Sequence, residues 1–127
     1  MTDDLISFLG ARLKEDEHAA QTAAGEHGPI WKAGENGGIV GGEELDTGGF
    51  LITALVHGLD VGRATTAHIA RHDPARVRAE VDAKRSAIAR ISNHSAVMGN
   101  DEIHGDLLRL LAQPYASHPD YREEWRP

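Results

Sequence analysis

Two histidines and an aspartate lie within six positions of one another, and their types and spacing are the strongest indication of a functional site in this sequence. His68 and His72 stand four positions apart, so a continuous helix would place both imidazoles on one face. Imidazole nitrogens are common zinc ligands, and the neighbouring Asp73 carboxylate could add an oxygen ligand. This pattern predicts a metal site formed by His68, His72 and Asp73.

Two features of the same stretch favour a structural role for these histidines. The HExxH motif of zinc proteases has glutamate directly after its first histidine, whereas this chain has Ile69 there. Asp73-Pro74 predicts that a helix ends near His72, where an imidazole can bond the last unpaired carbonyls. Three other histidines lie in stretches that resemble loops and could complete a metal site only if the fold brought them together: His94, His104 and His118.

The basic residues gather in one segment of an acidic chain. Residues 63–92 carry a net charge of +4, although the whole chain carries −7. A basic helix could bind a polyanion through five side chains: Arg71, Arg76, Arg78, Lys84 and Arg85. The negative charge elsewhere opposes approach to nucleic acid, so pairing with acidic neighbours on the same helix is the favoured interpretation.

The patterns that mark common enzyme classes are missing from the sequence. There is no cysteine, and none of the serines lies in a GxSxG turn. The glycine-rich stretch from Gly25 to Gly49 lacks the GxxxxGK[ST] pattern of a phosphate loop and contains Glu43-Glu44, which would repel phosphate. The sequence leans against an enzyme, indicates no catalytic residue and implies no cofactor.

Composition also bears on the compartment. A cysteine-free chain suits the reducing cytosol, and the acidic start Met1-Thr2-Asp3-Asp4 is unlike a signal peptide. The apolar run from Phe50 to Val56 is too short to span a bilayer. We therefore expect a cytoplasmic protein without a membrane partner.

Apolar periodicity and capping residues predict the helices. The first should cover residues 3–24 and stop at Gly25, and a second should cover 74–92, with Asp73 as its cap. A short helix is expected over 67–71, capped by Thr65 or Thr66, and another from Asp101 or Asp106 to Gln113-Pro114. Its Leu107, Leu108, Leu110 and Leu111 should supply core, and Ser92 to Asn100 should form a polar connector.

Three short apolar stretches predict strands: Ile30–Ala33, Ile39–Val40 and Phe50–Val56. Asn36-Gly37 suits a tight hairpin turn between the first two, because both residues tolerate positive φ angles. These elements predict an α+β fold in which three to four helices pack on a small antiparallel β-sheet of about three strands. The chain length and the lack of a linker predict a single domain over residues 1–127.

Two segments carry a resemblance to a known family. HIARHDPARVRAEVDAKR and LLRLLAQPYASHPDYREEWRP are similar to segments of a family of small, uncharacterised actinobacterial proteins that also occur in their phages. The resemblance covers the first helix, residues 68–85 and about the last twenty residues. The family has no established activity, so the resemblance assigns no catalytic residue.

The sequence therefore favours a non-enzymatic accessory protein or protein-interaction module. Tyr115, Tyr121 and Trp125 lie in the carboxyl-terminal tail, which we expect to dock rather than remain disordered. Either a homo-oligomer or another protein could be the partner. The alternatives are a metal-binding protein or metal-dependent enzyme using His68, His72 and Asp73, and nucleic-acid binding through residues 71–90.

Overall fold

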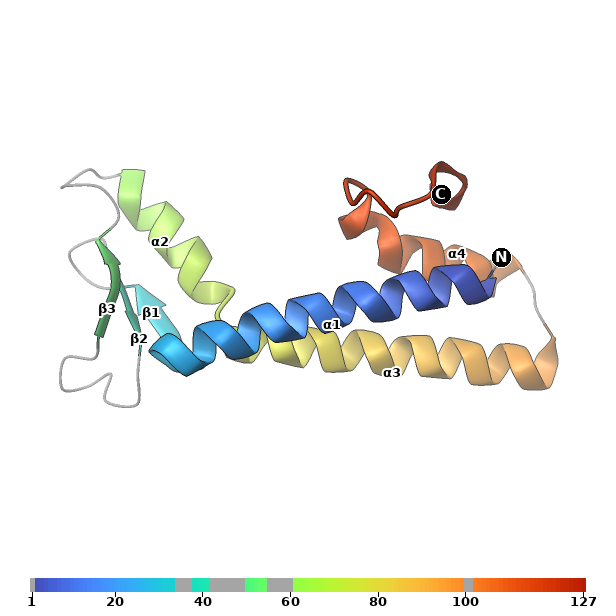
Figure 1. The fold of residues 1–127 in the computed structure, drawn as a ribbon, viewed down its shortest axis with the longest axis horizontal. Helices are drawn as coiled ribbons and strands as arrows, with labels where there is room; N and C mark the ends of the chain where they lie inside the picture. Colours follow the sequence, from blue (N-terminus) through green and yellow to red (C-terminus); the bar gives the residue numbers. More distant parts are fainter. Residues whose placement is uncertain (1, 34–37, 42–49, 55–60, 100–101) are drawn as a thin grey trace. The chain divides into compact units, whose positions relative to one another are not determined.

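The computed structural model describes residues 2–33, 38–41, 50–54, 61–99 and 102–127. Its elements follow the order α1 (Thr2–His27), β1 (Trp31–Ala33), β2 (Gly38–Gly41), β3 (Phe50–Ala54), α2 (Val61–Arg71), α3 (Pro74–Met98), α4 (Glu102–Ala112) and two short 3-10 helices, η2 (Gln113–Tyr115) and η3 (Glu123–Trp125) (Figure 1). They form two compact units. Unit 1 comprises Met1–Glu15 and Val81–Pro127, and unit 2 comprises Asp16–Glu80. Both α1 and α3 contribute to each unit, and the single-domain expectation for residues 1–127 stays a prediction.

Glycine in the left-handed conformation follows both long helices. α1 continues through the predicted stop at Gly25 and ends before Gly28, whose φ is 77°. α3 begins at Pro74 as predicted and continues to Met98, so the polar connector expected from Ser92 is wrong over its described part. Ser92 to Met98 contains no glycine or proline, and the helix ends before Gly99, whose φ is 87°.

α2 is longer than predicted and packs on two strands of unit 2. It begins at Val61, so Thr65 and Thr66 lie inside the helix instead of capping it. It contacts β1 and β2. Thr66 is almost fully buried, with 1% of its surface exposed, and Ala70 one turn later is buried as well. This face positions the end of α2, which carries His68 and is followed directly by His72.

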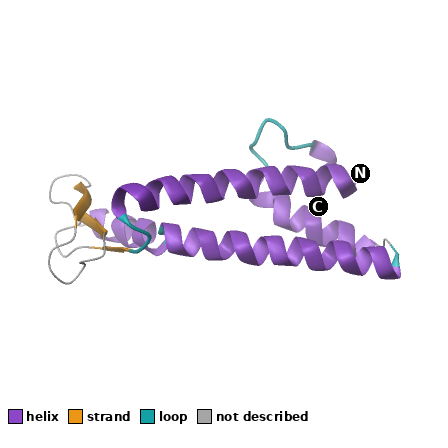
Figure 2. Cartoon of the chain, turned by 60° about the horizontal axis from the view of Figure 1, so that its bottom comes forward, coloured by secondary structure: helices purple, strands orange, loops and turns teal. Residues whose placement is uncertain are grey.

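The strands of the described residues pair antiparallel in the order β1-β2-β3. Figure 2 shows these strands in orange as a small part of a chain drawn mostly as helix. Trp31 lies opposite Gly41, and Ala33 lies opposite Ile39, whose side chain is buried. β2 and β3 pair with a register irregularity between Ile39 and Val40. The turn predicted at Asn36-Gly37 and the end of the third predicted strand lie outside the described residues.

The predicted α+β fold is wrong, because the structure is mostly helical. Among the described residues, the four α-helices contain 26, 11, 25 and 11 residues, whereas the three strands contain 3, 4 and 5. Strands of this length offer too little surface to carry a layer of three or four helices. The sequence-based prediction failed because it shortened α2 and α3 and treated a minor strand element as the platform of the fold.

Unit 1 has an apolar core at which its helices meet. The first part of α1 buries Leu5, Phe8, Leu9 and Leu13 at helical spacing. The later part of α3 buries Val81 and Ile88, and α4 buries Leu108 and Ala112. Because these side chains come from segments far apart in the sequence, the core joins both ends of the chain.

The carboxyl-terminal tail docks on α1, as the sequence predicted. The Phe8 ring, 6% exposed, lies 5.0 Å from the Trp125 ring centroid and 5.9 Å from that of Tyr121. Tyr115 meets the same ring edge-on at 6.4 Å. Aromatic pairs at these separations contribute about 0.5–1.5 kcal/mol each beyond the area they bury. Phe8 is therefore the central contact between α1 and the tail.

An arginine from the apolar face of α1 completes this contact. Arg12 is 7% exposed, and its Nε and Nη2 each donate to a Glu15 carboxylate oxygen at 2.9 Å. Its Nη1 lies 3.0 Å from His118 Nδ1, and its guanidinium lies 5.0 Å from the Phe8 ring centroid. The buried charge is thus satisfied by hydrogen bonds and stacking, as buried charges require.

Candidate functional site

The structure brings the predicted histidine pair together at the end of α2. The His68 and His72 ring centroids lie 4.5 Å apart, and both side chains are exposed. His72 Nδ1 donates to the His68 carbonyl oxygen at 2.8 Å, which confirms the predicted helix-end bond. This bond leaves His72 Nε2 as the ring nitrogen that could act as an acceptor or ligand.

Asp73 has a structural role between α2 and α3. Its Oδ1 accepts the Arg76 backbone N–H at 2.9 Å, which confirms it as the cap of α3. Its Oδ2 accepts the Trp31 backbone N–H at 3.1 Å and ties β1 to the start of that helix. Within the described part of the chain, no group of three or more histidine, cysteine, aspartate or glutamate residues is arranged to hold a metal ion. Metal binding by His68, His72 and Asp73 stays a prediction.

The three remaining candidate histidines divide between two places in unit 1. His94 Nδ1 and His104 Nε2 lie 2.7 Å apart and form a hydrogen bond between the end of α3 and the start of α4. One ring must donate and the other accept, so neither of these two nitrogens can bind a metal while the bond persists. His118 Nδ1 accepts the Asp120 backbone N–H at 3.1 Å and faces Arg12. Its role is to hold the tail.

Three of the five candidate polyanion-binding side chains interact with their neighbours. Arg76 Nε pairs with Glu80 at 2.9 Å, and Arg85 lies 4.0 Å from the Asp82 carboxylate. The Lys84 ammonium lies 5.9 Å from the Tyr115 ring centroid. Arg71 and Arg78 are exposed. Local charge pairing therefore involves Arg76 and Arg85 of these five side chains, and polyanion binding stays a prediction.

An exposed apolar face on α4 is the feature that the sequence analysis missed. Ile103, Leu107 and Leu110 follow i, i+4, i+7 spacing and are 66%, 42% and 50% exposed. Leu108, in contrast, is fully buried. The expectation that all four leucines of this helix supply core was therefore wrong for Leu107 and Leu110. We call Ile103, Leu107 and Leu110 the α4 face.

The two apolar sides of α4 could have been recognised on a helical projection. His104, Leu108 and Ala112 repeat every four residues and are all buried in unit 1. The α4 face lies on a different side, flanked by exposed Glu102 and Asp106. A helix that is apolar on two sides has more apolar surface than one core contact can cover.

The α4 face presents three aliphatic side chains on one side of a helix. Side chains at i, i+4 and i+7 are the usual anchors by which a helix binds an apolar groove or a second helix. None of the helices in the described ranges is long and apolar enough to cross a bilayer. Clustered exposed aliphatic side chains commonly mark interaction sites.

Comparison with known proteins gives a family but no activity. Neither the curated proteins nor the solved structures include a match to this chain. A family model described as "Family of unknown function (DUF6221)" matches residues 2–127. The match extends over α1, the strands, α2, α3, α4 and the docked tail. The chain therefore belongs to DUF6221, a family of unknown function.

Proposed function

We propose that this chain is a cytoplasmic, non-enzymatic protein-interaction module whose α4 face docks an amphipathic helix of a partner protein. The observation that carries the proposal is the exposure of Ile103, Leu107 and Leu110 on one side of a helix whose other side is buried. Burying an aliphatic side chain of this size contributes about 1.5–3 kcal/mol when it is fully covered. Three such anchors can support a specific but reversible contact.

Charge favours another protein over a second copy of this chain. The formal net charge is −7, so two copies repel each other at low salt. Exposed Glu102 and Asp106 flank the α4 face, although Asp106 also pairs with Arg109 at 3.1 Å. A partner helix with an apolar stripe and lysine or arginine flanks would complement both the anchors and the charge.

Two synthetic amphipathic helices that share one leucine stripe can test this proposal. One carries lysine flanks and the other glutamate flanks, and binding is measured by fluorescence anisotropy. We expect the lysine peptide to bind more tightly and the Ile103→Ser/Leu107→Ser variant to weaken its binding by about tenfold or more. Ile30→Ser is the matched control, because Ile30 is 51% exposed and lies in unit 2.

Two results would overturn the partner-helix proposal. Unchanged affinity of the lysine peptide for the double variant would place its binding elsewhere. A dimer in sedimentation velocity that Leu107→Ser dissociates and Ile30→Ser does not would make a second copy the occupant of the α4 face.

A metal-binding role is the second candidate, and the close approach of the His68 and His72 rings supports it. Under this role, untagged protein should contain a stoichiometric transition metal. His72→Gln should lose the metal, whereas His27→Gln, which alters a histidine at the end of α1, should retain it. Elemental analysis measures both, and the absence of stoichiometric metal from the parent protein would contradict this role.

A further inference from the structure

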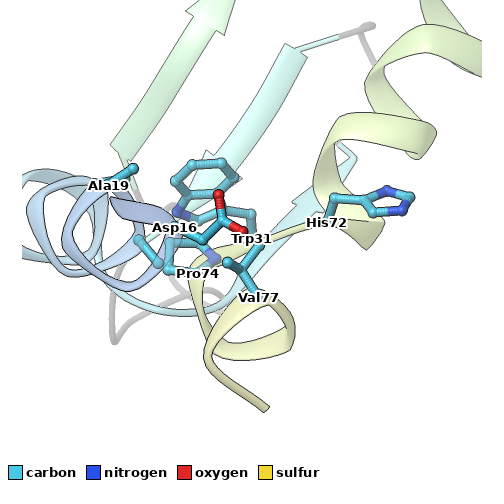
Figure 3. A pocket seen from close by; sticks show the side chains of 8 residues that line it. Asp16, Ala19, Trp31, His72, Pro74 and Val77 are labelled. Atoms are coloured by element: carbon cyan, nitrogen blue, oxygen red, sulfur yellow. The ribbon is translucent and has the colours of Figure 1, made fainter. Parts of the chain in front are cut away.

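A pocket of about 300 Å³ opens in unit 2, where the second part of α1 faces β1 and the start of α3 (Figure 3). Ala19, Ala20 and Ala23 line it from α1, and Pro74 and Val77 line it from α3. The small alanine side chains leave room that larger residues would fill. This volume lies at the lower end of the range for small-molecule sites, so it suits a compact ligand.

Trp31 supplies the aromatic wall of this pocket, and hydrogen bonds hold it at two points. Its indole Nε1–H donates to the Gly28 carbonyl oxygen at 3.0 Å, and its backbone N–H donates to Asp73 at 3.1 Å. The indole therefore has its polar atom satisfied within the protein. What the ring offers a ligand is its apolar, electron-rich face, which attracts cations.

Asp16 supplies a negative charge on the same pocket wall. Its carboxylate belongs to α1, and residues 1–62 of the chain carry a net charge of −8, which disfavours anionic ligands. His72 also lines the pocket, but Figure 3 shows its ring directed away from the Asp16 and Trp31 side chains. The pocket thus combines one carboxylate, one indole and an aliphatic lining.

We propose that this pocket binds a small organic cation, an ammonium group carried on an aromatic or aliphatic body. Asp16 pairs with the positive charge, and Trp31 adds a cation–π contact through its ring face. Ala19, Ala23 and Val77 contact the body of the ligand. A lysine side chain of another protein presents the same chemistry as a free ammonium compound. This site is in unit 2 and does not depend on the α4 face.

Three compounds of similar shape distinguish the contribution of charge to binding from that of apolar contact. They are benzylammonium, which is positive, benzyl alcohol, which is neutral, and benzoate, which is negative. Each is titrated into the isotopically labelled protein, and the indole N–H signal of Trp31 is followed by NMR. The missing signal in Trp31→Phe assigns it. We expect benzylammonium to shift this signal at the lowest concentration and benzoate to leave it unchanged. Equal affinity for all three compounds, or no shift of the Trp31 signal, would overturn the proposal.

Two charge variants on α1 locate the partner of the ammonium group. Asp16→Asn should weaken benzylammonium binding by about fivefold to tenfold and leave benzyl alcohol unaffected. Glu17→Gln removes the same charge from the next position, which does not line the pocket, and should change neither affinity. Equal losses in both variants would contradict a specific role for Asp16. If Asp16→Asn does not fold, the comparison of the three compounds on the parent protein still decides the proposal.

A second titration distinguishes the two sources of the ammonium group. A short peptide with one central lysine is compared with benzylammonium, and the same peptide with norleucine at that position serves as its control. Tighter binding of the lysine peptide identifies a protein side chain as the ligand, whereas tighter binding of benzylammonium identifies a free small molecule. Binding of the norleucine peptide as tightly as the lysine peptide would count against recognition of a cation.

Discussion

Replacing Phe8 with alanine should lower the free energy of unfolding by about 3–5 kcal/mol. The Phe8 ring is buried and contacts Trp125, Tyr121 and Tyr115 as well as the ring of His118 at 5.9 Å. Its loss would leave a cavity bordered by rigid rings, which cannot collapse to fill it. Chemical denaturation of the parent and variant proteins measures the difference.

Phe8→Leu is the matched control, because it retains most of the apolar volume and removes the edge-on ring contacts. We expect its free energy of unfolding to lie between that of the parent protein and that of Phe8→Ala. The tail provides an independent readout at Arg122, which pairs with Asp4 of α1 at 2.9 Å. Trypsin should cleave after Arg122 faster in Phe8→Ala than in Phe8→Leu. Equal stability and equal cleavage of all three proteins would contradict the docking of the tail on Phe8.

Replacing Asp73 with alanine should cost about 2–3 kcal/mol. Loss of the helix cap accounts for about 1 kcal/mol, and loss of a hydrogen bond from the Trp31 N–H to a charged oxygen adds about 1.5 kcal/mol or more. Thermal and chemical denaturation with and without added zinc would measure the effect. We expect the same loss under both conditions, since the two bonds connect Asp73 only to the backbone of the protein.

Two further variants separate the roles of the Asp73 carboxylate. Asp73→Asn keeps a capping oxygen and should lose less stability than the alanine variant. Asp82→Ala removes an exposed carboxylate from the same helix and should change stability by less than about 1 kcal/mol, because its partner Arg85 is 4.0 Å away at the surface. A loss for Asp73→Ala that appears only with zinc present would instead support the metal role.

The sequence predicted contacts in the candidate sites only where the residues involved lie a few positions apart in the chain. The four-residue separation of His68 and His72 was enough to foresee their contact, and Asp73-Pro74 was enough to foresee the cap of α3. The exposure of Leu107 and Leu110 was not predicted. The sequence shows that a helix carries several leucines, but the packing of the neighbouring helices decides which of them are buried. The pocket around Trp31 is lined by residues of α1, β1 and α3 and by the turn residue His72, so no local sequence pattern predicts it.

Sequence alone determined the helical character of residues 3–24 and 74–92, the start of α3 and the docking of the aromatic tail. These features follow from periodicity, capping and composition, which act within a few residues. Tertiary structure decided that Arg12 is buried beside Phe8 and that the strands remain a minor element of the fold. Those outcomes depend on contacts between residues as far apart as Arg12 and His118, whose pairing is not encoded in either local segment.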